Sequence, residues 1–174
     1  MESVTLAGGC FWCTEAIFKM LRGVAKVTPG YSGGDTPNPS YEQVCDETTG
    51  HAEAIQVEFD PKVITYPELL YVFFRLHDPT TLNKQGNDAG HSYRSAIFYQ
   101  DKTQKDEAEK ARDEAQVKYK DKIVTEIVPF KNFYEAENYH KDYYTKNQDA
   151  PYCQIIIDPK IEKLKKEFSQ FLKE

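Results

Sequence analysis

The sequence predicts a mixed α/β or α+β sandwich in which helices pack against one sheet. Segments in which apolar and polar residues alternate, as in strands, are interspersed along the chain with segments of helical periodicity. Apolar residues make up 40% of the 174 residues. This length and composition suffice for one domain with a core. No repeat or low-complexity tract interrupts the chain, so we expect a single domain over residues 1–174.

The first sixty residues predict three strands around one helix. Val4 and Leu6 share one face of a short strand, which the pair Gly8-Gly9 ends. A later stretch rich in Gly, Pro, Ser and Asp predicts turns. The predicted strands are residues 3–7, 24–27 and 51–59, the turns are residues 28–40, and the helix is residues 11–22 with the apolar stripe Cys13, Ile17, Met20 and Leu21.

The rest of the chain predicts helices separated by short strands. Thr65 is a predicted N-cap, with Pro67 and Glu68 in the first turn of a strongly amphipathic helix. Asp158 is a predicted N-cap with Pro159 at the first helical position. We further expect strands at 94–99 and 123–128, helices at 103–119 and 135–146, a final helix with the apolar face Ile161, Leu164, Phe168, Phe171 and Leu172, and a long polar loop at 78–92, which by its length is expected to be functional.

Charge and composition argue against several classes of protein. The net charge of −6 argues against nucleic-acid binding, which needs a basic patch. No run of about 18 apolar residues occurs, and no basic stretch followed by an apolar one opens the chain, so we expect a cytosolic protein without a membrane partner. Four cysteines in a chain of this length do not indicate a secreted disulfide scaffold. In a reducing compartment such thiols are catalytic, metal-bound or inert.

Cys10 lies where a strand and a double glycine meet the start of the first helix. Free backbone N–H groups and the positive end of the helix dipole lower the pKa of a thiol at such a place, which makes the thiol reactive. The alternative is a buried thiol that only packs. Cys13 forms a C-x-x-C pair with Cys10, the spacing of dithiol oxidoreductases, although its place on the apolar stripe favours a core position.

A zinc site is a third possibility for the opening thiols. Cys10, Cys13, Cys45 and His51 form a Cys₃His set, but the second pair is too widely spaced for the usual knuckle. We therefore expect no metal. The function classes that remain open on these residues alone are a thiol-dependent reductase, a general dithiol oxidoreductase and a zinc-stabilised interaction module.

Glu53 has the same strand parity as the apolar residues Ile55, Val57 and Phe59. A carboxyl group on that face is removed from water, so its pKa should rise and it can act as a general acid. The alternative is that Glu53 lies at the open end of the strand and is solvated. Asp88 in the long loop, Tyr93 before the next strand and Tyr41 after the turn region complete a candidate polar cluster.

Six motifs in order resemble the A-class peptide methionine sulfoxide reductases, from about residue 5 to about residue 155. They are Gly9-Cys10-Phe11-Trp12, Gly30-Tyr31-Ser32-Gly33-Gly34, Tyr41-Glu42-Gln43-Val44-Cys45, Thr49-Gly50-His51-Ala52-Glu53, Asn87-Asp88-Ala89-Gly90 with Tyr93-Arg94-Ser95, and Phe133-Tyr134-Glu135-Ala136-Glu137 with Tyr139-His140. The resemblance implies an α+β fold, a two-layer α/β sandwich around a ferredoxin-like β-α-β core, here with extra C-terminal helices.

The resemblance also implies roles for individual residues. Cys10 matches the nucleophile that attacks the sulfoxide sulfur, and Glu53 matches the acid that protonates the oxygen. Tyr41, Tyr93 and Asp88 match the groups that hold that oxygen and shape the site, and Phe11 and Trp12 match the apolar wall for the substrate methyl group. The implied substrate is the S epimer of methionine sulfoxide in oxidised proteins or peptides. The implied reductant is thioredoxin, with no bound cofactor, and we expect a monomer.

The thiol that resolves the oxidised Cys10 has three candidates. The family often places it in a C-terminal segment, so Cys153, in a predicted loop, comes first, followed by Cys13 and then Cys45. Cys13 is itself a departure, because many members have glycine there. His91-Ser92 stands where the family often has Thr-Gln, and a predicted helix from Lys160 to Glu174 replaces a glycine-rich tail.

Overall fold

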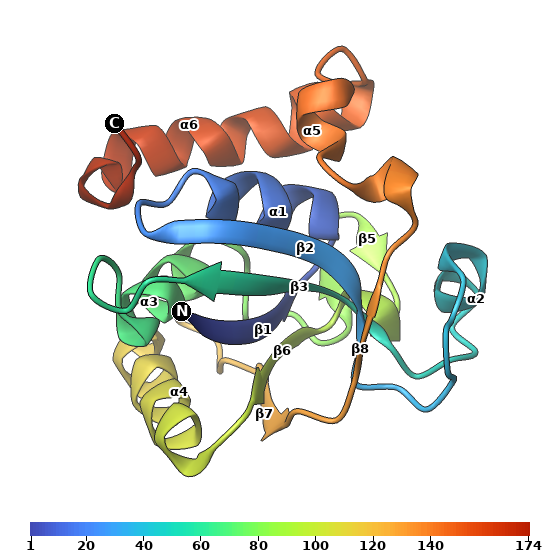
Figure 1. The fold of residues 1–174 in the computed structure, drawn as a ribbon, viewed down its shortest axis with the longest axis horizontal. Coiled ribbons are helices and arrows are strands. Elements are labelled where there is room, and N and C mark those ends of the chain that lie inside the picture. The colour runs from blue at the N-terminus through green and yellow to red at the C-terminus, as the bar shows by residue number, and fades with distance from the viewer.

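A computed structural model describes residues 1–174 and shows a curled six-stranded sheet with its main helices packed against it (Figure 1). The strand order is β7-β6-β1-β3-β2-β8, in which β6 and β7 pair in parallel and every other pair is antiparallel. The strands are β1 (Glu2–Gly8), β2 (Val24–Ser32), β3 (Ala52–Phe59), β6 (Ser95–Tyr99), β7 (Glu126–Pro129) and β8 (Phe133–Glu135), and the helices are α1 (Phe11–Lys19), α2 (Tyr41–Cys45), α3 (Tyr66–Leu76), α4 (Lys102–Gln116), α5 (Tyr143–Lys146) and α6 (Asp158–Glu167). The predicted α+β sandwich is confirmed.

Two faces of the sheet bury different residues. Val4 and Leu6 of β1 and the odd-numbered apolar residues of β3 join one large cluster with the apolar stripes of α1 and α3. Small residues such as Ala7, Ala52 and Ala96 line the opposite face. The helical layer therefore covers one face of the sheet, and α6 lies outside α1 as a further cover (Figure 1). None of the helices has the length and apolar character that a bilayer crossing requires.

The predicted N-cap of α3 is confirmed, whereas strand β2 is longer than predicted. Thr65 accepts from the Glu68 N–H, and Glu68 accepts from the Thr65 N–H, as in a capping box. Residues 28–32, predicted as turns, continue β2 between β3 and β8. Gly30 fits there because β8 crosses so closely that a Cβ at residue 30 would lie 2.4 Å from the Tyr134 carbonyl oxygen.

The predicted helix over residues 135–146 is wrong for most of its length. The segment holds the end of β8, a 3₁₀ turn at Asn138–His140 and the short α5. Asp142 breaks the helical course because its backbone is left-handed, with φ of 56°. Its N–H is held by both carboxylate oxygens of Glu15 on α1, at 2.9 and 3.1 Å.

The segment around Cys153 is also helical and not a loop. Residues 151–152 begin a helix that runs through a π-helical stretch, Cys153–Ile157, directly into α6. Asp158 is therefore no N-cap, and its carboxylate instead accepts from the Tyr144 hydroxyl. Residue 153 is fully buried in this segment.

The long loop after α3 is ordered by its own short elements. β4 (Lys84–Gln85) and β5 (Asp88–Ala89) pair as a small hairpin, and a 3₁₀ turn follows at His91–Tyr93. The Gln85 side chain bonds both the N–H and the carbonyl of Asp78, which fastens the hairpin to the end of α3. The loop thereby brings Gln85, Asp88 and Tyr93 to the start of α1.

Candidate active site

Cys10 is the residue that immediately precedes α1, and its carbonyl accepts the first backbone bonds of the helix. The chain reaches this position through Gly9, whose φ of +90° suits glycine, and a Cβ there would meet the Gln85 side chain at 2.7 Å. Cys10 is 7% exposed. The predicted strand-to-helix turn is confirmed, and it delivers a nearly enclosed thiol.

Glu53 lies on the helix-facing side of β3, beneath the start of α1. Its side chain is 1% exposed, and Oε1 accepts from the Phe11 backbone N–H at 3.2 Å. Oε2 is buried without a hydrogen-bond partner. Burial raises the pKa of Glu53 to about 8, and the charge of Asp88 adds to the rise, while the Phe11 N–H opposes it. The predicted burial of Glu53 is confirmed, and the raised pKa favours its protonated form at neutral pH.

The pKa of Cys10 does not follow the prediction. Burial raises it well above its usual range, and the Cys13 thiol and Glu53 act in the same direction, against the Trp12 backbone N–H. The backbone N–H groups at the helix start stabilise the thiolate form of Cys10. Its loss of hydration on burial destabilises that form by more, so the pKa rises. The pKa of Cys13 is lowered to about 7, chiefly by a hydrogen bond from Cys10 and also by the charge of Lys160.

Both thiols open onto one cavity of about 380 Å³. Tyr152 stands between the thiols and the hairpin, since its hydroxyl donates to Asp88 Oδ2 at 2.7 Å and lies 3.8 Å from Cys13 Sγ. The other walls are formed by β4-β5 and by the start of α6, with Gln85, Gly86, Asn87, Ile155, Ile156, Pro159 and Lys160.

An aromatic wall is built around the two residues that follow Cys10, Phe11 and Trp12. Trp12 stacks flat on Tyr143, with ring centroids 3.7 Å apart and an angle of 7° between the planes. The Trp12 indole N–H donates to Nδ1 of His140 at 3.0 Å. Phe11 is fully buried and stacks on Tyr41 at 6.4 Å. These rings form an aromatic cluster around the first turn of α1, directly after Cys10 in the chain.

The two predicted hydroxyls come from different elements. Tyr41 begins α2, and its backbone N–H donates to Glu137, whose other carboxylate oxygen accepts from the Tyr31 hydroxyl. Tyr93 ends the 3₁₀ turn after the hairpin. Burial raises the pKa of both Tyr41 and Tyr93, and Glu53 is the next cause for each. Both hydroxyls are therefore neutral hydrogen-bond donors on the Glu53 side of the site.

Of the predicted site residues, only Cys10, Cys13 and Asp88 line this cavity, whereas Glu53, Phe11, Trp12, Tyr41 and Tyr93 do not. Cys153 is packed behind it, and Cys45 is exposed on α2. The His51 ring bonds the Gly34 N–H through Nδ1 and the Thr36 carbonyl through Nε2. No group of three or more His, Cys, Asp or Glu side chains is arranged to hold a metal ion, so the Cys₃His set is not brought together.

Tyr152, His140, Tyr143 and Glu137 belong to the site but were given no role from the sequence, although Glu137 and His140 stand in one of the quoted motifs. Three of them lie in the segment predicted as a helix over residues 135–146, and a residue's neighbours across the fold cannot be read from such a prediction. Helix α2 was also missed, although Ser40 and Gln43 form a capping box whose S-x-x-Q spacing is visible in the sequence.

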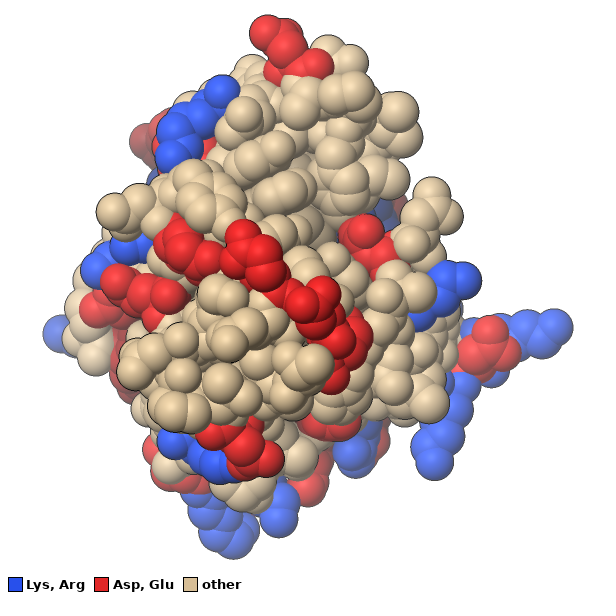
Figure 2. All heavy atoms as spheres, turned by 90° about the vertical axis from the view of Figure 1, so that its right-hand side faces the viewer, with Lys and Arg blue, Asp and Glu red and all other residues tan.

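The molecular face that carries α2 and β5 is acidic. Figure 2 shows Asp and Glu side chains across the middle of this face, with Lys and Arg towards its rim. On and just after α2, the exposed residues Glu42, Asp46 and Glu47 contribute to this charge. A substrate chain that approaches the cavity from this side meets a negative surface.

Comparison with known proteins agrees with the site geometry. The sequence model of the peptide methionine sulfoxide reductase family matches residues 2–172. A peptide methionine sulfoxide reductase MsrA of Sulfolobus acidocaldarius is 58% identical over 168 residues, which cover 97% of this chain and 96% of that protein. The structure of Mxr1 from Saccharomyces cerevisiae in reduced form is 44% identical, has a TM-score of 0.83 and covers 87% of this chain and 88% of that one. Mxr1 in complex with Trx2 aligns with a TM-score of 0.59 and 35% identity, covering 82% and 84%.

Proposed function

Because the chain belongs to the peptide methionine sulfoxide reductase family and reduces methionine sulfoxide, we propose that Cys10 is the nucleophile and Glu53 the acid of this reaction. One observation carries the proposal. A buried carboxyl group with a pKa of about 8 is tied to the residue next to a nearly enclosed thiol. Such a pair supplies both the sulfur nucleophile and the proton that the sulfoxide oxygen needs.

The protons of the first step balance within this pair. The Cys10 sulfur attacks the sulfoxide sulfur while Glu53 protonates the oxygen through Oε2, the carboxyl oxygen without a partner. The thiol proton of Cys10 returns to Glu53. The oxygen, with its proton, passes to the Cys10 sulfur, so the products are methionine and a Cys10 sulfenic acid.

The surrounding side chains account for substrate binding. Phe11 and Trp12 offer a ring surface on which a thiomethyl group packs well. Tyr41 and Tyr93 donate to the sulfoxide oxygen, and Asp88 shapes the cavity through its bond with Tyr152. Fixed hydroxyls on one side and rings on the other distinguish the two epimers, and we assign the S epimer to this site.

The geometry favours Cys13 over Cys153 as the first resolving thiol, which reverses the order expected from the sequence. Cys13 lies one helical turn from Cys10 and lines the same cavity. The charge of Lys160 and the Tyr152 hydroxyl favour the Cys13 thiolate, which can attack the Cys10 sulfenic sulfur. That attack forms the disulfide and releases the hydroxyl, which leaves as water with one proton. Cys153, in contrast, is fully buried in the helical 151–157 segment and does not line the cavity.

Reduction of the disulfide by an external dithiol completes the cycle. The complex of Mxr1 with Trx2 supports a thioredoxin as the donor, which acts by thiol–disulfide exchange. Apart from this external dithiol, each step uses only this chain's thiols and carboxyl group, so the proposed cycle needs no bound cofactor. The biological substrates are proteins or peptides that bear methionine S-sulfoxide.

A single turnover without added reductant tests these assignments. Enzyme is mixed with a racemic blocked methionine sulfoxide, both epimers and methionine are quantified, and disulfides are mapped by mass spectrometry. We expect about one equivalent of methionine, loss of the S epimer only, and a Cys10–Cys13 bridge.

The variants separate the roles of the thiols. Cys10→Ser should form no methionine, and Cys45→Ser is the matched control that should behave as wild type. A Cys10–Cys153 bridge in the first turnover would refute the assignment of Cys13 and leave the nucleophile in place. Methionine formation by Cys10→Ser would refute the nucleophile.

A further inference from the structure

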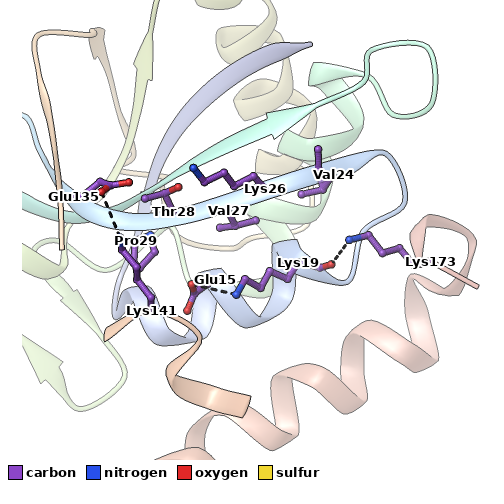
Figure 3. A pocket seen from close by; sticks show the side chains of 11 residues that line it. Glu15, Lys19, Val24, Lys26, Val27, Thr28, Pro29, Glu135, Lys141 and Lys173 are labelled. Carbon is purple, nitrogen blue, oxygen red and sulfur yellow. Dashed lines mark hydrogen bonds and ion pairs between the residues drawn. The ribbon is translucent and has the colours of Figure 1, made fainter. Parts of the chain in front are cut away.

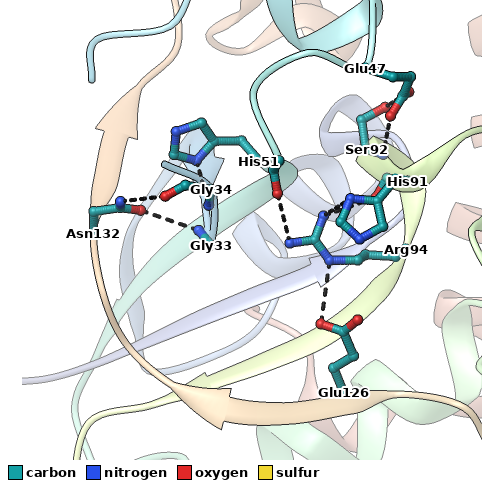
Figure 4. A network of polar contacts seen from close by, with 10 residues as sticks. Gly33, Gly34, Glu47, His51, His91, Ser92, Arg94, Glu126 and Asn132 are labelled. Atoms are coloured by element: carbon teal, nitrogen blue, oxygen red, sulfur yellow. Dashed lines mark hydrogen bonds and ion pairs between the residues drawn. The ribbon is translucent and has the colours of Figure 1, made fainter. Parts of the chain in front are cut away.

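Glu47 holds the turn that carries Tyr93 by two hydrogen bonds. Its carboxylate accepts from the Ser92 backbone N–H at 3.0 Å through Oε2 and from the Ser92 hydroxyl at 2.7 Å through Oε1 (Figure 4). Ser92 is fully buried and immediately precedes Tyr93 in the 3₁₀ turn. The side chain of Glu47 thus reaches from the exposed loop after α2 into the base of this turn.

The backbone on both sides of this contact is unusual. Glu47 itself is left-handed, with φ of 62°, a conformation that residues with a Cβ disfavour. Gly90 has φ of +140°, and a Cβ there would lie 2.3 Å from Glu47 Oε1. A glycine at position 47 would relieve the first of these costs but would remove the carboxylate. Glu47 therefore adopts a disfavoured backbone conformation at a position from which its carboxylate can accept hydrogen bonds from Ser92.

A second bridge joins the same two segments. Arg94, directly after Tyr93, is buried and donates to the carbonyl of Gly50 at 3.1 Å and to the carbonyl of His91 at 3.0 Å. Gly50 in turn leads into β3, which carries Glu53. Figure 4 shows both bridges on the two sides of the turn. The loop that leads to Glu53 and the turn that presents Tyr93 are thus fastened together at two points.

We propose that Glu47 is a positioning residue that sets the Tyr93 hydroxyl relative to Glu53 through its bonds to Ser92. This inference rests on the proposed function, in which Tyr93 binds the sulfoxide oxygen and Glu53 protonates it. The pair also lies where the sequence departs from the family pattern, at His91-Ser92. A displacement of about 1 Å at a group that orients substrate can cost up to about a hundredfold in rate.

The Glu47 carboxylate has a second effect that must be separated from positioning. Its negative charge is one of the causes, after burial, Asp88 and Cys13, that raise the pKa of Glu53. The groups that face Glu53 from the elements around it are Cys10, Cys13 and the Phe11 N–H of α1, Tyr31 of β2, Tyr41 and Cys45 of α2, Asp88 of β5, Tyr93 of the turn, and Glu47.

The test is a double-mutant cycle of Glu47→Gly with Tyr93→Phe, read as kcat and KM for a blocked methionine S-sulfoxide. Glycine suits the left-handed backbone, which offsets part of the cost of leaving two Ser92 donors without an acceptor, so Glu47→Gly should fold with a slightly lower melting temperature while lowering kcat/KM about tenfold. In the Tyr93→Phe background the same change should cost less than about twofold. Asn38→Gly, at another exposed left-handed residue, is the control for the glycine substitution and should leave kcat/KM unchanged.

Glu47→Gln separates position from charge. An amide at this position can still accept from the Ser92 N–H, so it should restore most of kcat/KM at pH 7 while lowering the pH at which activity declines. Full activity of Glu47→Gly, or a loss that adds fully to that of Tyr93→Phe, would overturn the inference and leave the reductase assignment intact. An inactive wild-type enzyme in the same assay would instead refute the proposed function.

Discussion

The Phe11 backbone N–H donates to Oε1 of Glu53 at 3.2 Å, while Oε2 of the same carboxyl group is buried without a partner. The residue beside the proposed nucleophile therefore orients the proposed acid and leaves one carboxyl oxygen free to carry a proton. Because burial raises the pKa of Glu53 to about 8, that oxygen is protonated at neutral pH. The orientation and the proton of the acid thus come from the same local geometry.

Glu53→Gln should lower kcat by about a hundredfold or more, because the amide keeps the shape but provides no acidic proton. In the wild type the active form is protonated, so kcat should fall as the pH rises through about 8. The residual activity of the variant should lack this decline. Single-turnover rates between pH 6 and 9.5 measure both effects, and an unchanged alkaline decline in the variant would show that another group causes it.

The same substitution should stabilise the fold at alkaline pH. The pKa of Glu53 is raised in the folded state, so the unfolded chain releases the proton first and wild-type stability is lost as the pH rises from about 4.3 to 8. A glutamine does not titrate. Relative to wild type, the unfolding free energy of Glu53→Gln should therefore gain roughly 3 kcal/mol between pH 5 and pH 8. Urea unfolding at the two pH values checks this, and a difference that does not change with pH would contradict it.

Much of the site could be predicted because its two central groups follow from local patterns. Strand parity places Glu53 on the buried face, and a double glycine before an amphipathic helix places Cys10 at the helix start. The pKa order of Cys10 and Cys13 could not be predicted, since burial, which only the folded chain defines, outweighs the helix terminus. The Glu47–Ser92 contact joins residues 45 positions apart and leaves no trace in periodicity.

The fold was predicted correctly where the sequence periodicity is strong. It was predicted wrongly where contacts between distant residues determine the local structure. α3 has both a clear apolar stripe and a capping box, and it begins at the expected residue. β2 was cut short because its Gly and Pro residues resemble turns, whereas packing against β8 explains them. The segment after Glu135 has helical periodicity, but the bond from the Asp142 N–H to Glu15 breaks the helix.

His140 should make substrate binding sensitive to acid. Its Nδ1 accepts from the indole of Trp12, which requires a neutral ring, and burial lowers its pKa. Protonation of His140 as the pH falls below about 6.5 removes this acceptor, so the Trp12 indole loses its hydrogen bond at acid pH. In the wild type, KM should therefore rise as the pH falls further below about 6.5.

His140→Asn tests this cause because its amide oxygen can accept from the indole and does not titrate. The KM of His140→Asn should change less with pH than the KM of the wild type, and at pH 8 it should be a few times higher than the wild-type value. Trp12 is the only tryptophan, so its emission reports the same contact directly. An acid-induced rise in KM that persists in His140→Asn would exclude this histidine as its source.

Peptides with basic neighbours should bind better than peptides with acidic ones. The face around α2 is rich in Asp and Glu (Figure 2), and exposed charges act through a screened field. A methionine sulfoxide peptide flanked by lysines should have a KM about two to five times lower than its glutamate-flanked counterpart at low salt. The difference should shrink by 0.5 M salt, and a difference that is independent of salt would point to direct contacts.

Glu15 should support the aromatic wall without taking part in chemistry. Both of its oxygens accept from the Asp142 N–H, and Lys19 pairs with it at 3.5 Å (Figure 3). This anchor fixes the left-handed turn between His140 and Tyr143, two of the three rings that contact Trp12. Glu15→Ala leaves a part-buried N–H without its charged acceptor, which should cost about 2 kcal/mol of unfolding free energy.

Because Glu15 does not line the thiol cavity, Glu15→Ala should raise KM several-fold while leaving kcat at saturating substrate within about twofold. Glu135→Gln is the matched control. Glu135 lies on the same hollow surface (Figure 3), but its pair with Lys141 at 3.3 Å is exposed, so its loss should cost no more than about 0.5 kcal/mol. Steady-state kinetics and thermal unfolding of both variants measure these changes in KM, kcat and stability. A fall in kcat with an unchanged KM would show that Glu15 acts on the reacting groups and not on the wall.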